Sequence, residues 1–253
     1  MKQFVLLLIL IIATPAAATS TPRDLLQAGD YQDARVTALA QDTVDGFNVA
    51  AEVMAAEIML MRVDDAKDHA KDALKLTDRA LDRDPANVEA LFLKALHTGF
   101  RTRSSSAFAI LMKGLVGDTY DAIEAFAAAA PDDPRADALY GAWHLGIVRA
   151  VGDGKFEASL SEGLAHYDRA VAAMPTDIVV MGNYAFSLIV MEDPDLLSRA
   201  TDILTQIEAT EPTDATATET KARMMTLLAV IDDPAALKTR AKGLLNTEED
   251  KAK

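Results

Sequence analysis

The chain has 253 residues, of which half are hydrophobic and only 6% are aromatic, a composition that favours closely packed helices over a sheet. The formal net charge of −14 excludes a nucleic-acid-binding footprint and sustained attraction to an anionic membrane, since both require clustered basic residues. The absence of cysteine excludes disulfides, thiolate metal sites and a cysteine nucleophile.

Residues 1–18 are expected to form a cleaved secretory signal peptide. Lys2 supplies positive charge, Phe4 to Ile12 supply a short apolar segment, and Ala16 to Ala18 supply the small residues that a signal peptidase requires. The apolar segment is about half of the roughly 20 residues that a helix needs to span a bilayer, and an uncleaved anchor is the competing interpretation. Cleavage would release a soluble protein into the periplasm or the medium, without stable membrane insertion.

The next segments predict a series of helices. Residues Asp24 to Ala34 contain the end of one helix, a turn at Gly29 and the start of a second helix. An Ala- and Met-rich helix is expected over Asn48 to Arg62. Asp65 then begins a helix that continues to Leu81, because acidic side chains are favourable at a helix N-terminus.

A spaced pattern recurs four times along the chain. In each copy a helix carries a small residue, then two further packing positions, then a proline that closes it, and a second helix follows, as at Asn87 after Pro85. The four copies are Ala73, Thr77, Ala80, Pro85; Ala122, Phe126, Ala129, Pro134; Gly163, Tyr167, Ala170, Pro175; and Ala200, Leu204, Ile207, Pro212. Four copies in one chain indicate an internal repeat of helix pairs.

This pattern resembles the tetratricopeptide repeat family. The Gly29-Asp30-Tyr31 turn supports the resemblance, as do small residues ten positions after three of the prolines, at Ala95, Ala185 and Ala222. The resemblance covers about Gly29 to Leu245 and implies an all-α, right-handed solenoid of about five to six helix pairs. The repeat domain is expected over residues 19–246, with a flexible polar tail over 247–253.

The repeats are irregular, because the prolines lie 49, 41 and 37 residues apart whereas the family repeats every 34 residues. The excess falls in two insertions, Phe100 to Asp118 and Ala150 to Ser161. Ten residues after Pro134, where the other copies have alanine, the sequence has His144. A shorter turn would place Ala142 at this packing position instead, and we favour the shorter turn.

The last predicted helix pair spans Thr213 to Ile231 and Pro234 to Leu245. Asp233 is expected to cap the second of these helices, with Pro234 at its first position.

By resemblance, the first helix of each pair lines a concave wall. The implied wall positions, with Trp143 added if Ala142 packs, are Phe92, Leu96, Phe100, Trp143, Gly182, Phe186 and Ile189. Family members that grip an acidic peptide C-terminus carry Lys and Asn on this wall, so the apolar wall here argues against that role. It is suited to a hydrophobic peptide, a lipid-like ligand or another part of the chain; alternatively, these residues are core.

Arg101, Arg103 and Lys113 form a basic island in an acidic chain. Arginine binds carboxylates and phosphates bidentately, so the island predicts an anion-docking site at the rim of the wall. The alternative is that these arginines close a helix C-terminus and pair with nearby acids.

Two clusters suggest chemistry only weakly. Trp143-His144 offers a conceivable base, but no serine, cysteine or paired acid accompanies it at a telling spacing. The second cluster lies along one side of the helix that begins at Asp65 and consists of Asp65, Asp68, His69 and Asp72. These side chains could bind a divalent ion, but such a row of charges is more commonly a solvated helix face. No nucleotide- or metal-binding motif is present, and no catalytic residue, metal or cofactor is predicted.

The leading hypothesis is therefore a non-catalytic periplasmic scaffold that binds a protein or peptide partner in its concave groove. The alternative is a small-molecule binder similar to the tetratricopeptide accessory subunits of certain periplasmic solute transporters, and an enzyme is the third hypothesis. A protein partner predicts a long groove with an apolar floor, whereas a small ligand predicts a closed pocket. The sequence leaves the oligomeric state open.

Overall fold

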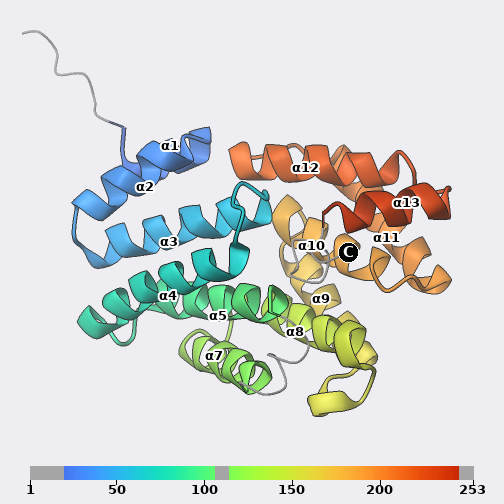
Figure 1. The fold of residues 1–253 in the computed structure, drawn as a ribbon, viewed down its shortest axis with the longest axis horizontal. Coiled ribbons are helices and arrows are strands. Elements are labelled where there is room, and N and C mark those ends of the chain that lie inside the picture. The colour runs from blue at the N-terminus through green and yellow to red at the C-terminus, as the bar shows by residue number, and fades with distance from the viewer. Residues whose placement is uncertain (1–19, 106–113, 245–253) are drawn as a thin grey trace, which may run out of the picture.

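The computed structural model describes residues 20–105 and 114–244 (Figure 1). The described residues form α-helices joined by short turns, with no β-strand, which confirms the all-α class. The predicted signal peptide, the polar tail and Lys113 lie outside the described residues. The helices are α1 (Pro22–Ala28), α2 (Tyr31–Ala40), α3 (Val44–Met59), α4 (Ala66–Arg83), α5 (Val88–Arg103), α7 (Leu115–Ala129), α8 (Arg135–Val151), α9 (Leu160–Ala173), α10 (Ile178–Ile189), α11 (Pro194–Ala209), α12 (Ala215–Leu228) and α13 (Pro234–Lys242), with a 3-10 turn at Lys155–Glu157.

These helices pack in adjacent pairs, as expected for an α-solenoid. Within the described residues the pairs are α1/α2, α3/α4, α5/α7, α8/α9, α10/α11 and α12/α13. None of these helices is both long and apolar enough to span a bilayer.

Three predicted helix starts are confirmed by their caps. The Asp65 carboxylate accepts a hydrogen bond from the Asp68 amide at 2.9 Å, and the Asn87 side chain accepts one from the Ala90 amide at 2.9 Å. Asp233 likewise accepts from the first amides of α13. Each cap satisfies amides that would otherwise lack a partner in the first turn.

Most of the repeated small and apolar positions are buried between helices. In α4, Ala73, Thr77 and Ala80 have no exposed surface, and the corresponding positions of α11 have equally little. The copy in α7 is different, since Ala129 is exposed. The prediction that Ala129 is a packing residue is therefore wrong.

The reason is that the α7 copy is closed by Pro131 and not by Pro134. α7 ends two residues before Pro131, just as α4 ends two residues before Pro85. Counted from Pro131, the packing positions are Thr119, Ile123 and Phe126, all of which are buried.

The same change of alignment corrects the packing of α8. Gly141, ten residues after Pro131, faces α9, where an added Cβ would lie 2.5 Å from a ring carbon of Tyr167. The favoured interpretation that Ala142 packs here is wrong, because Ala142 is exposed. Ala95 and Ala185 are buried as predicted, whereas Ala222 is exposed, so the prediction that it is a packing position is wrong.

Six helices, one from each pair, form an inner ring: α1, α3, α5, α8, α10 and α12. Each contacts the next, and α12 contacts α1 (Figure 1). Three closing contacts join the two ends of the chain. The Tyr31 hydroxyl lies 3.1 Å from the Thr216 hydroxyl, Arg62 forms a two-pronged ion pair with Glu219 at 2.7 and 2.8 Å, and Arg223 donates to the Leu60 carbonyl.

Candidate functional site

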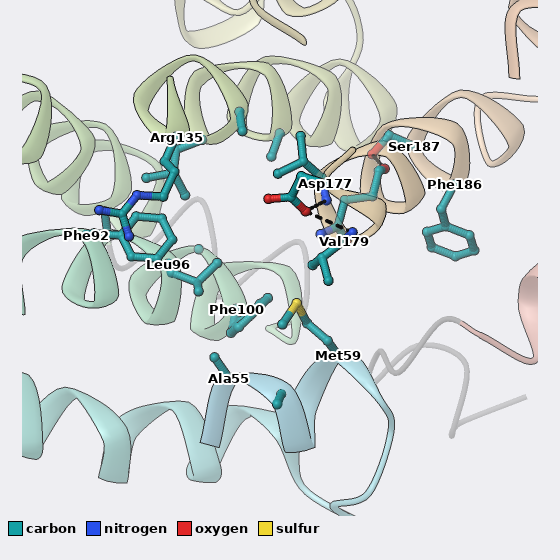
Figure 2. A pocket seen from close by; sticks show the side chains of 18 of the residues that line it. Ala55, Met59, Phe92, Leu96, Phe100, Arg135, Asp177, Val179, Phe186 and Ser187 are labelled. Atoms are coloured by element: carbon teal, nitrogen blue, oxygen red, sulfur yellow. Dashed lines mark hydrogen bonds between the residues drawn. The ribbon is translucent and has the colours of Figure 1, made fainter. Parts of the chain in front are cut away.

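The inner ring surrounds a cavity of about 980 Å³, to which all six of its helices contribute residues. Figure 2 shows lining side chains from α3, α5, α8 and α10. Helix α5 lines it along its whole length, from Glu89 near its start to Arg103 at its end. These two residues are 14 positions apart, or about 21 Å at the rise of an α-helix. The cavity is therefore elongated along α5.

The middle of the cavity is apolar. Phe92, Leu96 and Phe100 of α5 face it from one side, and Met59 of α3 and Val179 of α10 approach from two others (Figure 2). A wall of this composition binds hydrocarbon by removing it from water, at about 25 cal/mol per Å² of buried apolar area before ordering costs.

Helix α8 creates much of the empty space, because it presents small residues to the cavity. Ala138, Ala142, Gly146 and Ala150 recur every four residues and so lie on one face. A Cβ added at Gly146 would meet no atom within 4 Å. Larger side chains at these positions would fill the cavity.

At one end of the cavity the arginines are paired with acids. Arg23 lies 3.0 Å from Glu52, and Arg135 lies 2.9 Å from Glu89 and 2.8 Å from Asp133. The Arg135 guanidinium also stacks 4.2 Å above the Phe92 ring (Figure 2). Burial raises the pKa of Glu52, and the neighbouring Arg23 opposes this effect. The charges at this end are thus satisfied within the protein.

The N-terminus of α10 borders the cavity and is also satisfied. The Asp177 carboxylate accepts hydrogen bonds from the amides of Val179 at 3.0 Å and Val180 at 2.9 Å, drawn as dashed lines in Figure 2. These bonds occupy the amides that would otherwise attract an anion there.

The other end of the cavity brings together Arg103, Arg149, Tyr167 and Ser187. Tyr167 stacks face to face on Tyr184, with ring centroids 4.5 Å apart. Burial raises the pKa of Tyr167 to about 12, although Ser187 and the charge of Arg103 both act to lower it. The hydroxyl therefore stays protonated at neutral pH.

Most of the predicted wall residues line this cavity, as Phe92, Leu96, Phe100, Arg103 and Phe186 do. Trp143 also borders the cavity, but its ring is buried and its indole N–H donates to the Val116 carbonyl at 3.1 Å, so it is chiefly a packing residue.

Three other residues predicted for this wall lie elsewhere. Arg101 does not border the cavity and instead forms an ion pair with Asp118 at 3.0 Å. Gly182 packs against Thr220 of α12, and Ile189 is buried in the core.

Several cavity residues were not predicted. Arg149, Tyr167 and Ser187 were missed, and so were the paired arginines Arg23 and Arg135. For Arg149 a signal existed: it stands eighteen residues after Pro131, as Arg103 stands eighteen residues after Pro85. The choice of Pro134 as the repeat proline concealed this correspondence.

The two weak chemical clusters are engaged in packing and ion pairs. His144 does not line the cavity, and its Nδ1 accepts a hydrogen bond from the Ser159 amide at 3.1 Å. In the Asp-His stripe, His69 lies 2.8 Å from Glu57, while Asp68 and Asp72 pair with lysines. No group of three or more His, Asp or Glu residues within the described ranges is arranged to hold a metal ion.

No protein-family model, curated protein or solved structure matches the chain.

Proposed function

We propose that this protein binds a small organic molecule with an elongated apolar part inside the cavity of the inner ring. The observation that carries this proposal is the ring closure, in which α12 contacts α1 and turns the concave surface into a partly enclosed cavity. Its volume of about 980 Å³ is near the upper end of the usual range for small-molecule sites, about 300–1,000 Å³.

The ring closure favours this alternative over the scaffold hypothesis. A protein partner lying on the concave wall would need an open groove, and here α1 and α12 meet across it. A protein or peptide partner in the concave groove stays a prediction. We further infer that the helix pairs are tetratricopeptide-type repeats wound in a right-handed sense, and that the exported protein serves as a ligand-binding accessory to solute uptake.

A cavity-filling variant tests the proposal. A neutral apolar fluorophore, N-phenyl-1-naphthylamine, should bind the purified protein with a rise in emission. Gly146→Phe should weaken the binding of the fluorophore, because the ring would occupy part of the space that Gly146 leaves open on the cavity side of α8.

Gly117→Phe is the matched control, since Gly117 is also a helical glycine with no atom near its added Cβ, but it does not border the cavity. This variant should bind the fluorophore as the unmodified protein does. Equal binding by Gly146→Phe and the unmodified protein would contradict the proposal.

A further inference from the structure

Two arginines occupy equivalent positions of neighbouring repeats at one end of the cavity. Arg103 ends α5 and stands eighteen residues after Pro85. Arg149 lies in the last turn of α8 and stands eighteen residues after Pro131. Glu89 and Arg135, which mark the opposite end, each stand four residues after the same prolines and lie 2.9 Å apart. The two helices therefore run side by side in register and bring both arginines to one level.

Neither arginine has an acidic partner among the described residues. Arg103 is exposed to the cavity but surrounded by protein, and burial lowers its pKa; the nearby charge of Arg149 lowers it further. Its side chain lies over the Phe100 ring at 5.2 Å. By contrast, Arg23 and Arg135 at the other end of the same cavity are neutralised by carboxylates.

Arg103 is surrounded by protein, and no carboxylate among the described residues replaces the hydration that it has lost. Two like charges at the same place add repulsion. An anion supplied by a ligand would remove both costs. Such an arrangement in a chain of net charge −14 has a direct interpretation as a site built for a ligand anion.

We propose that Arg103 and Arg149 bind the carboxylate of a monocarboxylic acid whose hydrocarbon chain lies in the apolar middle of the cavity. This inference rests on the proposed function and adds the chemical class of the ligand. Arginine matches a carboxylate with two parallel hydrogen bonds, and the protonated Tyr167 hydroxyl is a further donor at this end. At the opposite end Arg23 and Arg135 are already paired with Glu52 and Glu89, so a second carboxylate on the ligand would find no unpaired cation there.

Competition between matched ligands tests the inference. Octanoate and octan-1-ol share their chain length and differ in charge, so each is titrated against bound N-phenyl-1-naphthylamine at neutral pH. Octanoate should compete at least about tenfold more tightly, as expected for charge-assisted hydrogen bonds in an enclosed site. Octylammonium should compete more weakly than octan-1-ol because the two arginines repel it.

Variants locate the effect. Arg103→Gln and Arg149→Gln should each reduce the preference for octanoate to less than about threefold while the fluorophore still binds, which also shows that the variant is folded. Arg101→Gln is the matched control on the same helix, because Arg101 pairs with Asp118 outside the cavity. It should keep the full preference.

The outcomes separate the two proposals. If the unmodified protein binds the fluorophore but does not distinguish octanoate from octan-1-ol, the carboxylate site is wrong and the cavity function stands. If the fluorophore, octanoate and octan-1-ol all fail to bind the unmodified protein, both proposals are overturned. A preference for octanoate that survives in Arg103→Gln and Arg149→Gln would also refute the assignment to these arginines.

Discussion

His97 is a buried titratable group that links α5 to α3. Its Nε2 donates to the Ala51 carbonyl at 2.9 Å, and its Nδ1 is buried with no hydrogen-bond partner in the described part of the chain. This arrangement suits the neutral imidazole, because a proton on Nδ1 would have no acceptor. Burial lowers the pKa of His97 to about 4.

We expect acid to destabilise the fold through this residue. In the unfolded chain the histidine titrates near 6.5, so the unfolded state binds more protons than the folded state between about pH 6.5 and pH 4. Stability is therefore fully present above that window and is lost as the pH falls through it, by on the order of 3 kcal/mol at pH 4. Urea unfolding at pH 7, 5.5 and 4.5 measures this loss.

His97→Gln separates this contribution from that of other groups. The glutamine amide can still donate to the Ala51 carbonyl but does not titrate, so the variant should lose less stability than the unmodified protein between pH 7 and pH 4.5. His144, whose pKa burial also lowers, and the carboxylates leave a residual dependence. Parallel pH profiles for the two proteins would show that His97 is not the cause.

At the level of the elements, the helices and their pairing were predictable because their signals are local. Caps such as Asp65, Asn87 and Asp233 mark helix starts within three residues, and small buried positions recur with helical spacing. The alignment of the α7 copy was not predictable in the same way. Pro131 and Pro134 both fit the local pattern, and the choice between them needs the packing: Ala129 is exposed, and Gly141 contacts Tyr167 on another helix.

The basic island shows a second limit of local reasoning. Arg101 and Arg103 were grouped because they are close in sequence, but residues two apart on a helix point in nearly opposite directions. One pairs with Asp118 and the other lines the cavity. The periodicity of α5 alone was sufficient to separate them, whereas the partnership of Arg103 with Arg149 required the corrected alignment.

The helix contacts themselves predict the effect of larger side chains. Ala80 and Ala170 have no exposed surface, so replacing either by leucine should overpack its contact and cost roughly 1–3 kcal/mol of unfolding free energy. Ala129→Leu is the matched control, because Ala129 ends α7 and is exposed. Thermal or urea unfolding should show losses for the first two variants only, and a comparable loss for Ala129→Leu would mean that the corrected alignment is wrong.

The closure of the ring belongs to the whole molecule, and no motif encodes it. It results from the curvature added by six successive helix pairs, so a small difference in each turn would leave α1 and α12 apart. The residues that meet there, Tyr31, Arg62, Thr216 and Glu219, carry no signal in the sequence that would link them. The enclosed cavity could therefore be offered only as one of two alternatives.

The closing contacts should control access to the cavity. Glu219→Gln removes the ion pair with Arg62, whose side chains are 34% and 45% exposed, and should lower stability by less than about 1 kcal/mol. It should nevertheless speed dissociation of N-phenyl-1-naphthylamine severalfold in stopped-flow measurements, since α12 separates more readily from the turn after α3. High salt should bring the unmodified protein closer to the variant, because salt screens exposed charges.

Asp72→Asn is the matched control, since it removes an exposed ion pair with Lys75 on the outer surface of α4. This variant should leave the dissociation rate unchanged. If Glu219→Gln and Asp72→Asn have the same rate, ligand exchange does not pass through the contact between α12 and the turn after α3.

The contact between Tyr31 and Thr216 also has a consequence for folding, because it spans 185 positions of sequence. In an open array each repeat interacts only with its neighbours, so folding spreads along the chain and the end repeats fray first. Here the loop-closure entropy between α2 and α12 is recovered only after the intervening repeats are in place, so we expect this contact to form late. Once it forms, the array has no free end, and the amino-terminal and carboxyl-terminal helices gain or lose structure together.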